Sequence, residues 1–387
     1  MSHPSPLTVG IDIRLIGKQR TGDETVFFQL VRELIRQHAS DIRYELYTDE
    51  ARDDQLAALR LKLDALGRED VHIVSLPAKN RFLWNAIVLP VRLFRHPVDV
   101  FHTQYILPLL LPRRLKVVTH IHDVSFYAHP EWIGRSDLFF LRLFLPRTFS
   151  RSDCVIVPSE FTRSEVLEYT ALPAQRIRMI NNAVAEEWYQ PISLEMIRAV
   201  TARYGLAPYH YFISSGTLQP RKNIPRLIEA FRRAVQTHGL THALVLTGSL
   251  SGHNVDPQIQ SATRGNIIYS GYVSDEDLRA LVAGAAGYVF PSLYEGFGIP
   301  ILEARAQGTA VLASDIPVFH EVGGEQIQYF NPCSLAQMTE KLYTFSIDNL
   351  EEKPEDKRFS SDDRPYSWTR SAIQLAQLYR LLGGRSS

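Results

Sequence analysis

The chain has 387 residues, which is more than one hydrophobic core usually supports, so we expect two domains. Hydrophobic residues make up 45% and charged residues 22% of the chain, as is typical of a globular protein. Lys plus Arg and Asp plus Glu both number 42, so there is no net basic field, and we do not expect nucleic acid as a partner.

The N-terminus has no basic stretch followed by a long apolar run, so we expect no secretory signal. The longest apolar runs fall short of the roughly 20 residues that a membrane-spanning helix needs. Cys154 and Cys333 have no second Cys or His at ligand spacing, which favours reduced thiols over a metal site. These features predict a cytoplasmic protein, either in solution or on the inner face of the membrane.

In the first half of the chain, short apolar runs alternate with amphipathic stretches of helical length. The expected strands are Thr8–Ile13, Tyr44–Thr48, His72–Ser75, Val98–His102, Lys116–Thr119, Cys154–Val157 and Arg178–Ile180. The expected helices are Glu24–Gln37, Arg135–Ser150 and Glu160–Thr170. This alternation predicts an α/β fold in which helices cover both faces of a parallel sheet.

The second half repeats this plan. The expected strands are Tyr211–Ser215, Ala243–Thr247, Ile267–Ser270, Tyr288–Phe290, Ala310–Ala313 and Gln328–Phe330. The expected helices are Asn223–Val235, Asp275–Gly284, Pro300–Gln307, Val318–Val322, Leu335–Phe345 and, after a charged loop at Glu351–Pro365, Ser367–Leu382. Turn formers within Ala183–Pro208 place the hinge there. We therefore expect two doubly wound domains facing a central cleft, residues 1–190 and 191–365, with a closing segment at 366–387.

Loops that follow the strands of such sheets are the usual ligand sites. The first informative loop runs from Gly216 and Thr217 to Arg221, Lys222 and Asn223. Two adjacent cations and the free amides of a helix start suit a diphosphate. The alternative is that both cations are solvated residues of a first helical turn. Because the helix dipole disfavours cations there, we favour the anion site.

The second loop, with the segment EGFGIPILE at residues 295–303, follows the expected strand Tyr288–Phe290. Gly296 and Gly298 allow a ligand to approach the backbone closely, and Pro300 suits the first turn of a helix. Alone, this pattern also fits a tight strand-to-helix turn. The carboxylates of Glu295 and Glu303 on either side favour a site that contacts both ends of one ligand.

These motifs resemble retaining glycosyltransferases of family 4, which have the GT-B fold. EGFGIPILE is similar to the E-x7-E signature of that family, and GTLQPRKN is similar to its phosphate-binding loop. The GYVSD segment, with Val273, resembles its base-facing loop. The opening strand Val9–Arg14 and the closing helix with Trp368 and Tyr379, which crosses back to the first domain, extend the resemblance over nearly the whole chain.

The resemblance implies a metal-independent enzyme that needs no cofactor and binds a nucleoside diphosphate sugar as its donor. It assigns the ribose to Glu303, donor-sugar hydroxyls to Glu295, and the leaving diphosphate to Arg221 and Lys222. The amides around the glycine loop assist at the phosphates. The donor-binding set implied by the resemblance therefore includes Gly216, Thr217, Val273, Gly296, Phe297, Gly298 and Ile299.

In the first domain, His122 and Asp123 follow an expected strand. Without the resemblance, His122 is as well explained by a structural role. The family has a His-Asp pair here, so the resemblance assigns His122 to the donor sugar, with His120 and Asp123 as supports. The chain departs from the family in its glycine-rich loop, where only Gly22 remains within Arg20–Thr25. Its two acids either cap the helix, chiefly through Asp23, or face an acceptor, so acceptor recognition is left open.

Three first-domain segments mix arginine with large apolar residues: Arg81–His96, Leu107–Lys116 and Leu138–Arg147. They suggest either ordinary helices with cationic rims or a peripheral membrane surface that admits a lipid-linked acceptor. The favoured function is transfer of mannose from GDP-mannose to a glycan or lipid-linked acceptor. A UDP-sugar donor, a sugar-nucleotide epimerase and a non-catalytic nucleotide-sugar binder are the alternatives.

Overall fold

A computed structural model of the chain describes residues 5–17, 22–217, 219–248, 264–348 and 364–384. Three sequence predictions lie partly outside these ranges, at Arg20 and Thr21, at Leu218, and at residues 351–363 of the charged tail. The chain divides into two compact units. Unit 1 comprises Met1–Val124, Arg135–Asn182 and Tyr366–Ser387, and unit 2 comprises Ser125–Gly134 and Ala183–Pro365. The domain bounds expected from the sequence stay a prediction.

Unit 1 is built on a seven-stranded sheet with the order β3-β2-β1-β4-β5-β6-β7, and every neighbouring pair is parallel. Its strands are β1 Leu7–Asp12, β2 Ile42–Thr48, β3 Val71–Ser75, β4 Val100–Gln104, β5 Lys116–His120, β6 Cys154–Val157 and β7 Ile177–Met179. Each predicted strand of this half is confirmed. Continuous apolar runs mark them because both faces of a parallel sheet are covered.

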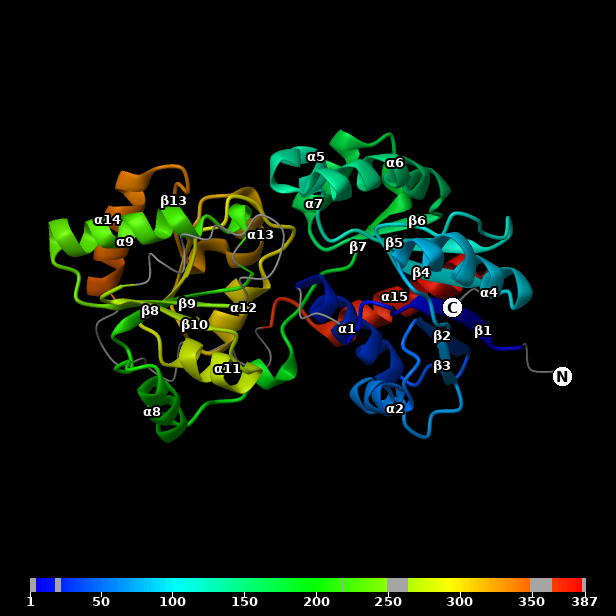
Figure 1. The fold of residues 1–387 in the computed structure, drawn as a ribbon, viewed down its shortest axis with the longest axis horizontal. Helices are drawn as coiled ribbons and strands as arrows, with labels where there is room; N and C mark the ends of the chain where they lie inside the picture. The colour runs from blue at the N-terminus through cyan, green and yellow to red at the C-terminus, as the bar shows by residue number, and fades with distance from the viewer. Residues whose placement is uncertain (1–4, 18–21, 218, 249–263, 349–363, 385–387) are drawn as a thin grey trace. The chain divides into compact units, whose positions relative to one another are not determined.

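Helices of unit 1 lie on both sides of this sheet (Figure 1). They are α1 Gly22–Arg36, α2 Asp53–Lys62, α3 Arg81–Leu83, a π-helical turn Trp84–Val88, α4 Leu89–Arg95, α6 Arg135–Arg151, α7 Glu160–Tyr169 and a 3-10 turn Ala174–Arg176. Helix α2 was not predicted from the sequence, because it buries only Leu59 and therefore shows no apolar stripe.

The C-terminal helix α15, Trp368–Leu382, packs against α1 within unit 1, as predicted. Arg380 binds Asp41 through two hydrogen bonds of 2.7 and 2.9 Å. Tyr379 is fully buried, and its hydroxyl lies 2.6 Å from Nδ1 of His102 on β4. The helix that ends the chain is thus an integral part of the unit that begins it.

Unit 2 contains a six-stranded parallel sheet with the order β10-β9-β8-β11-β12-β13. Its strands are β8 Tyr211–Ser215, β9 Ala243–Thr247, β10 Ile267–Gly271, β11 Gly287–Phe290, β12 Val311–Ser314 and β13 Gln328–Phe330. These also confirm the prediction. In both sheets the strands run parallel, so their carboxyl ends gather the following loops at one edge.

The helices of unit 2 are α5 Ser125–Ala128, α8 Leu194–Arg203, α9 Ile224–His238, α11 Asp275–Ala283, α12 Ile299–Ala306, α13 Pro317–Gly323 and α14 Leu335–Asp348. Short 3-10 turns are Pro130–Trp132, Glu186–Tyr189, Pro220–Lys222 and Gly324–Gln326. Helix α8 lies among turn formers and was not predicted from the sequence, although Ser193 caps it by accepting from the amide of Met196. Helix α9 turns its apolar residues toward the sheet, at the three- and four-residue spacing that identified it.

Candidate functional site

The loop after β8 carries the two predicted cations at the carboxyl edge of the unit 2 sheet. Gly216 has a φ of +129°, a backbone conformation that a side chain rarely tolerates, and its amide donates to the carbonyl of Thr247. Arg221 and Lys222 then form a 3-10 turn. This glycine conformation and the turn after it direct the loop back over the end of the sheet.

The alternative, in which both cations are solvated residues of the first turn of α9, is wrong. Asn223, with a φ of 56°, separates the 3-10 turn from α9. The side chains of Arg221 and Lys222 are only 23% and 13% exposed, so neither is a solvated residue. Because both side chains are largely withdrawn from solvent, another group must compensate their charge.

That group is Glu295, in the loop after β11. Its Oε2 lies 2.6 Å from Nη1 of Arg221, and its Oε1 lies 2.6 Å from Nζ of Lys222. The Arg221 carbonyl also accepts from the amide of Leu293, which ties the two loops together. Strands β8 and β11 are neighbours, which explains why residues more than 70 positions apart meet here. We call Arg221, Lys222 and Glu295 the ion-pair cluster.

The ion-pair cluster keeps a buried carboxylate charged. Glu295 is only 7% exposed, and burial by itself raises the pKa of an acid. The adjacent charges of Arg221 and Lys222 outweigh that effect and hold the pKa of Glu295 at about 2. The three side chains together carry a net charge of about +1, which remains available to a further anion.

The glycine loop after Glu295 leads directly into α12. Phe297 is buried, and Gly298, with a φ of +111°, occupies the position before the helix, where it offers no capping side chain. A Cβ atom at Gly298 would lie 3.0 Å from Phe319. Both this close contact and the positive φ disfavour a larger residue. Ile299 begins the helix, and Pro300 lies in its first turn as predicted.

Glu303 lies in the second turn of α12, one turn beyond the prediction. Its side chain is half-buried, and no hydrogen bond to its carboxyl group is found among the described residues. Burial and the nearby carboxylate of Asp275 raise its pKa to about 8. A half-buried carboxyl group without a donor is suited to accept hydrogen bonds from ligand hydroxyls.

Tyr288 on β11 connects these parts, and sequence reasoning missed it. Its hydroxyl lies 2.7 Å from Oγ of Ser215, at the end of β8. Burial raises its pKa, and the charges of Glu303 and Glu295 act in the same direction. Because Tyr288 is one apolar-looking member of a predicted strand, nothing in the sequence pattern distinguished it. Its contacts with Ser215 fix the end of β8, directly before the Gly216 loop.

A narrow pocket lies at the carboxyl ends of β8 and β11, and its lining includes Gly216, Thr217, Lys222, Phe290 and Ser292. Both residues that were predicted for the phosphate loop, Gly216 and Thr217, thus border the ion-pair cluster. Val273, the predicted base-facing residue, is buried between β10 and the first residue of α11. The predicted residues of unit 2 therefore lie in the loops that follow β8, β10 and β11 and at the start of α12.

In unit 1, His122 follows β5 and is 5% exposed. Its Nε2 lies 2.8 Å from Oε1 of Gln104, the last residue of β4. With the amide oxygen as acceptor, the proton resides on Nε2, which leaves Nδ1 as a buried acceptor without a partner among the described residues. Asp123 is half-buried next in the chain. Gln104 was not predicted, because only the pairing of β4 with β5 brings it beside His122.

His122 is the outermost member of a buried histidine stack. Its ring centroid lies 4.3 Å from that of His120, and His120 stacks on His102 at 6.1 Å. Burial, together with the neighbouring His122 and His102, lowers the pKa of His120 well below its usual value. Burial and His122 lower the pKa of His102 to about 3. The inner two rings are therefore neutral at physiological pH.

The shortened glycine loop differs from its prediction in one respect. Gly22 is exposed and is the first residue of α1. Asp23 was expected to cap the helix, but it accepts a 3.3 Å hydrogen bond from the hydroxyl of Tyr105 instead. The acid that binds nearby backbone is Glu24, which accepts from the amide of Gly17 at 2.7 Å. Both acids thus have partners within unit 1.

Comparisons with known proteins agree with this arrangement. Residues 20–188 match the family described as Glycosyltransferase Family 4, and residues 205–358 match Glycosyl transferases group 1. O-antigen chain mannosyltransferase B of Escherichia coli is 31% identical over 277 residues, which cover 70% of this chain and 72% of that protein. O-antigen chain mannosyltransferase RfbU of Salmonella typhimurium is 28% identical over 276 residues, or 70% of each chain.

Solved structures share the fold. A glycosyltransferase from Rickettsia africae ESF-5 has a TM-score of 0.71 at 18% identity and covers 98% of this chain and 100% of its own. WaaG, a glycosyltransferase involved in lipopolysaccharide biosynthesis, has a TM-score of 0.66 at 17% identity, with 97% and 98% covered. The chain therefore has the GT-B fold and belongs to glycosyltransferase family 4, a family of retaining hexosyltransferases.

Proposed function

We propose that this enzyme transfers mannose from GDP-mannose to a glycan or a lipid-linked acceptor during assembly of a surface polysaccharide. The names of two relatives, both O-antigen chain mannosyltransferases, support mannose and this setting. GT-B glycosyltransferases bind nucleotide-sugar donors, so the class of donor follows from the family. The choice of guanine and of mannose is the finer part of the proposal.

The ion-pair cluster is the observation that carries the proposal. A diphosphate needs cations that are fixed in position, and Arg221 and Lys222 are each held by a 2.6 Å contact to Glu295. A carboxylate offers about four lone-pair sites, so Glu295 can bind both cations and still accept from sugar hydroxyls. The glycine loop at Gly296, Phe297 and Gly298 adds backbone amides beside the same cluster.

We assign the steps of transfer as follows. A bond forms between the acceptor oxygen and the anomeric carbon on the face that the diphosphate leaves, and the bond from that carbon to the phosphate oxygen breaks. The acceptor proton passes to the leaving oxygen, so no protein nucleophile is required. Arg221 and Lys222 stabilise the charge that develops on the diphosphate, which is commonly the largest catalytic contribution.

The remaining predicted residues have binding roles in this proposal. Glu303, whose carboxyl group has no hydrogen-bond partner among the described residues, accepts from the ribose hydroxyls, and Val273 faces the base. Gly216, Thr217 and Ile299 contribute their backbone to the phosphates. In unit 1, Nδ1 of His122 is free to accept from a sugar hydroxyl, and Asp123 and Gly22 are assigned to the region around sugar and acceptor.

A calorimetric panel of GDP, UDP and ADP and their sugars tests the donor. We expect GDP-mannose to bind and raise the melting temperature, because a ligand of the native state stabilises it. Release of GDP should then require an acceptor extract. Binding of UDP-glucose in place of GDP-mannose would contradict the mannose proposal. Tight binding without any transfer or hydrolysis would instead indicate a non-catalytic binder.

The variant Lys222→Ala tests the role of the cluster in turnover. We expect kcat to fall about a hundredfold, as is common when one group that stabilises developing charge is removed. Lys341→Ala is the matched control, since Lys341 lies on α14 of the same unit and is outside the proposed site. Equal kcat values in the two variants would exclude Lys222 from the reaction.

A further inference from the structure

The first turns of helix α6 contain several large apolar residues, and none of them is buried. Its first ten residues read RSDLFFLRLF, yet its buried residues, Leu145, Thr148 and Phe149, all come later. Phe139 is 70% exposed and Leu143 58% exposed. Large apolar side chains one turn apart, both in solvent, mark a helix face that lacks its partner.

The segment Arg81–Arg95 shows the same property on its outer side. Trp84, Leu89 and Leu93 are fully buried and form part of a hydrophobic core. Other large apolar side chains of the same segment are exposed: Phe82 at 55%, Ile87 at 53%, Val91 at 42% and Phe94 at 56%. The expectation of ordinary helices with apolar faces in the core therefore explains only the inner side of this segment.

Direct contacts join these elements into one surface. Arg81 forms a 2.8 Å ion pair with Asp137 on α6, and its guanidinium lies 4.9 Å from the ring centroid of Phe140. Arg147 of α6 donates to the carbonyls of Pro108 and Leu109, and the amide of Leu109 donates to the carbonyl of Asn85. The loop 107–116, with Leu110 63% exposed, therefore bridges α6 and the π-helical turn.

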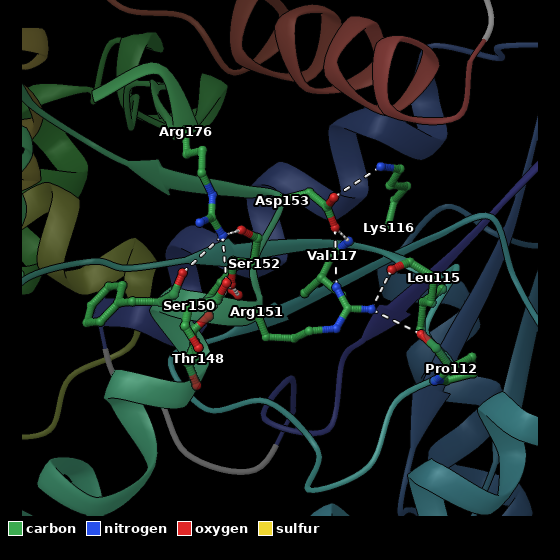
Figure 2. Close-up of polar contacts among 12 residues, drawn as sticks. Pro112, Leu115, Lys116, Val117, Thr148, Ser150, Arg151, Ser152, Asp153 and Arg176 are labelled. Carbon is green, nitrogen blue, oxygen red and sulfur yellow. Dashed lines mark hydrogen bonds and ion pairs between the residues drawn. The ribbon is translucent and has the colours of Figure 1, made fainter. Parts of the chain in front are cut away.

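The last turn of α6 is firmly anchored, as Figure 2 shows. Arg151 donates to the carbonyls of Pro112 and Leu115, at 3.0 and 2.7 Å. Arg176 donates to the carbonyls of Ser150 and Ser152 at the end of the helix, where a cation also complements the helix dipole. This end fixes the helix, so the exposed residues of its first turns are held on a supported element.

The same surface is strongly basic although the whole chain is neutral. Residues 79–96, 107–116 and 135–151 contain four, three and four Lys or Arg residues and a single acid, Asp137. Asp137 is already paired with Arg81. The exposed cations of these segments are Lys79, Arg95, Arg113, Arg114, Arg135 and Arg142. Exposed apolar side chains together with exposed cations complement the acyl region and headgroups of an anionic lipid bilayer.

We propose that this basic apolar face of unit 1, formed by α3, α4, the loop 107–116 and the first turns of α6, docks on anionic lipid membranes. Within the described ranges no helix is long and apolar enough to cross a membrane, so the contact is peripheral. Phe139 and Leu143 enter the headgroup region, while Arg113, Arg114 and Arg142 contact lipid phosphates. This surface holds the enzyme where a lipid-linked acceptor would be presented.

Flotation of the full chain with vesicles tests the proposal. We expect binding to phosphatidylethanolamine vesicles that contain phosphatidylglycerol, and little binding to phosphatidylcholine alone. Added salt should weaken it, because surface charges are screened. The double variant Phe139→Ser, Leu143→Ser should bind about tenfold or more weakly through lost apolar burial. The double variant Arg113→Gln, Arg114→Gln should lose about fivefold per arginine.

Matched controls come from α2 and its end in the same unit. Leu61 and Leu66 are 63% and 60% exposed, so Leu61→Ser with Leu66→Ser removes equal apolar exposure outside the proposed face. This control should bind vesicles as the wild type does. Circular dichroism and GDP binding verify that each variant is folded, independently of membrane binding.

Three results would overturn the proposal. The folded wild type could fail to bind phosphatidylglycerol vesicles, or the Phe139→Ser, Leu143→Ser variant could bind as well as the α2 control. Alternatively, sedimentation could reveal a dimer that this variant abolishes, which would assign the face to a second copy of the chain. None of these outcomes bears on donor binding by unit 2.

Discussion

The two units hold their buried titratable side chains in opposite charge states. In unit 2, Glu295 stays ionised although buried, because Arg221 and Lys222 each lie 2.6 Å away. In unit 1, His102 and His120 have no charged partner in their stack, and burial keeps both neutral. The same fold thus supplies fixed charge in one unit and neutral hydrogen-bonding groups in the other.

We expect the largest effects on stability and rate from removing the carboxylate of the ion-pair cluster. In Glu295→Ala, two cations remain close together and largely buried without compensation. We expect unit 2 to lose roughly 3–5 kcal/mol of unfolding free energy, as is typical when a buried pair loses one partner. Initial rates of nucleotide release should fall about a hundredfold or more. Urea denaturation and the rate assay measure the two effects.

The matched control for this variant is Glu229→Ala. Glu229 pairs with Arg233 four residues later on α9, and both side chains are about half exposed. Such an exposed pair contributes at most about 1 kcal/mol. If Glu295→Ala were no more destabilised than this control, the claim that the cluster is tightly coupled would be refuted.

We expect the second carboxyl group of unit 2 to make donor binding depend on pH. The pKa of Glu303 is about 8 because of burial and of the carboxylate of Asp275 on α11. A carboxylate accepts hydrogen bonds from ribose hydroxyls better than a carboxylic acid does. Donor binding below pH 8 should therefore release the proton of Glu303. Donor affinity should therefore rise from pH 6 to 8, by at most about tenfold per unit.

Glu303→Gln provides the check, because it keeps the shape and removes the titration. Calorimetry in buffers of different ionisation enthalpy would count the released proton. We expect the variant to bind the donor about ten- to a hundredfold more weakly at pH 8, since hydrogen bonds to charged groups contribute about 1.5–3 kcal/mol. Unchanged pH dependence in the variant would remove Glu303 from the site.

Mild acid should affect the two units in opposite directions. The pKa of His102 falls from 6.5 to about 3 on folding, so its stabilising contribution is complete above pH 6.5 and is lost as pH falls. The pKa of Glu303 rises from 4.5 to about 8, so its contribution is complete below pH 4.5 and is lost as pH rises. Between pH 6.5 and 4.5, acid destabilises unit 1 through His102 and stabilises unit 2 through Glu303.

Hydrogen exchange, read separately for the two sheets, measures this effect. The expected slopes are on the order of 1 kcal/mol per pH unit for each titrating group. Slopes of the same sign in β4 and β5 of unit 1 and in β8 and β11 of unit 2 would contradict the assignment of neutral histidines and a protonated Glu303.

The strands were predictable from the sequence because the strands of a parallel sheet are continuous apolar runs. Helices with an apolar stripe, such as α9, were predictable because their apolar residues recur every three or four positions. The family motifs also located the loops that carry Glu295 and Lys222. Helix α2 was not predictable, since it buries one residue only.

Partnerships within the site needed the order of the strands. Glu295 meets Lys222 because β8 and β11 are neighbours, and His122 meets Gln104 because β4 pairs with β5. Local hydrophobic periodicity does not reveal which strands are neighbours. The two cations were therefore identified from the sequence, but their charge was expected to be compensated by a bound anion rather than by Glu295.

The central claim is that fixed charge for the diphosphate lies in unit 2, and titration of GDP into three forms of the enzyme tests it most directly. Lys222→Ala should bind GDP about ten- to a hundredfold more weakly than the wild type, because a charged partner of the phosphates is lost. It should lose less affinity for GDP-mannose, whose diphosphate carries less charge. Gln104→Leu, which alters the histidine stack of unit 1, should bind GDP as the wild type does. Undiminished GDP affinity in Lys222→Ala, or an equal loss in both variants, would contradict the claim.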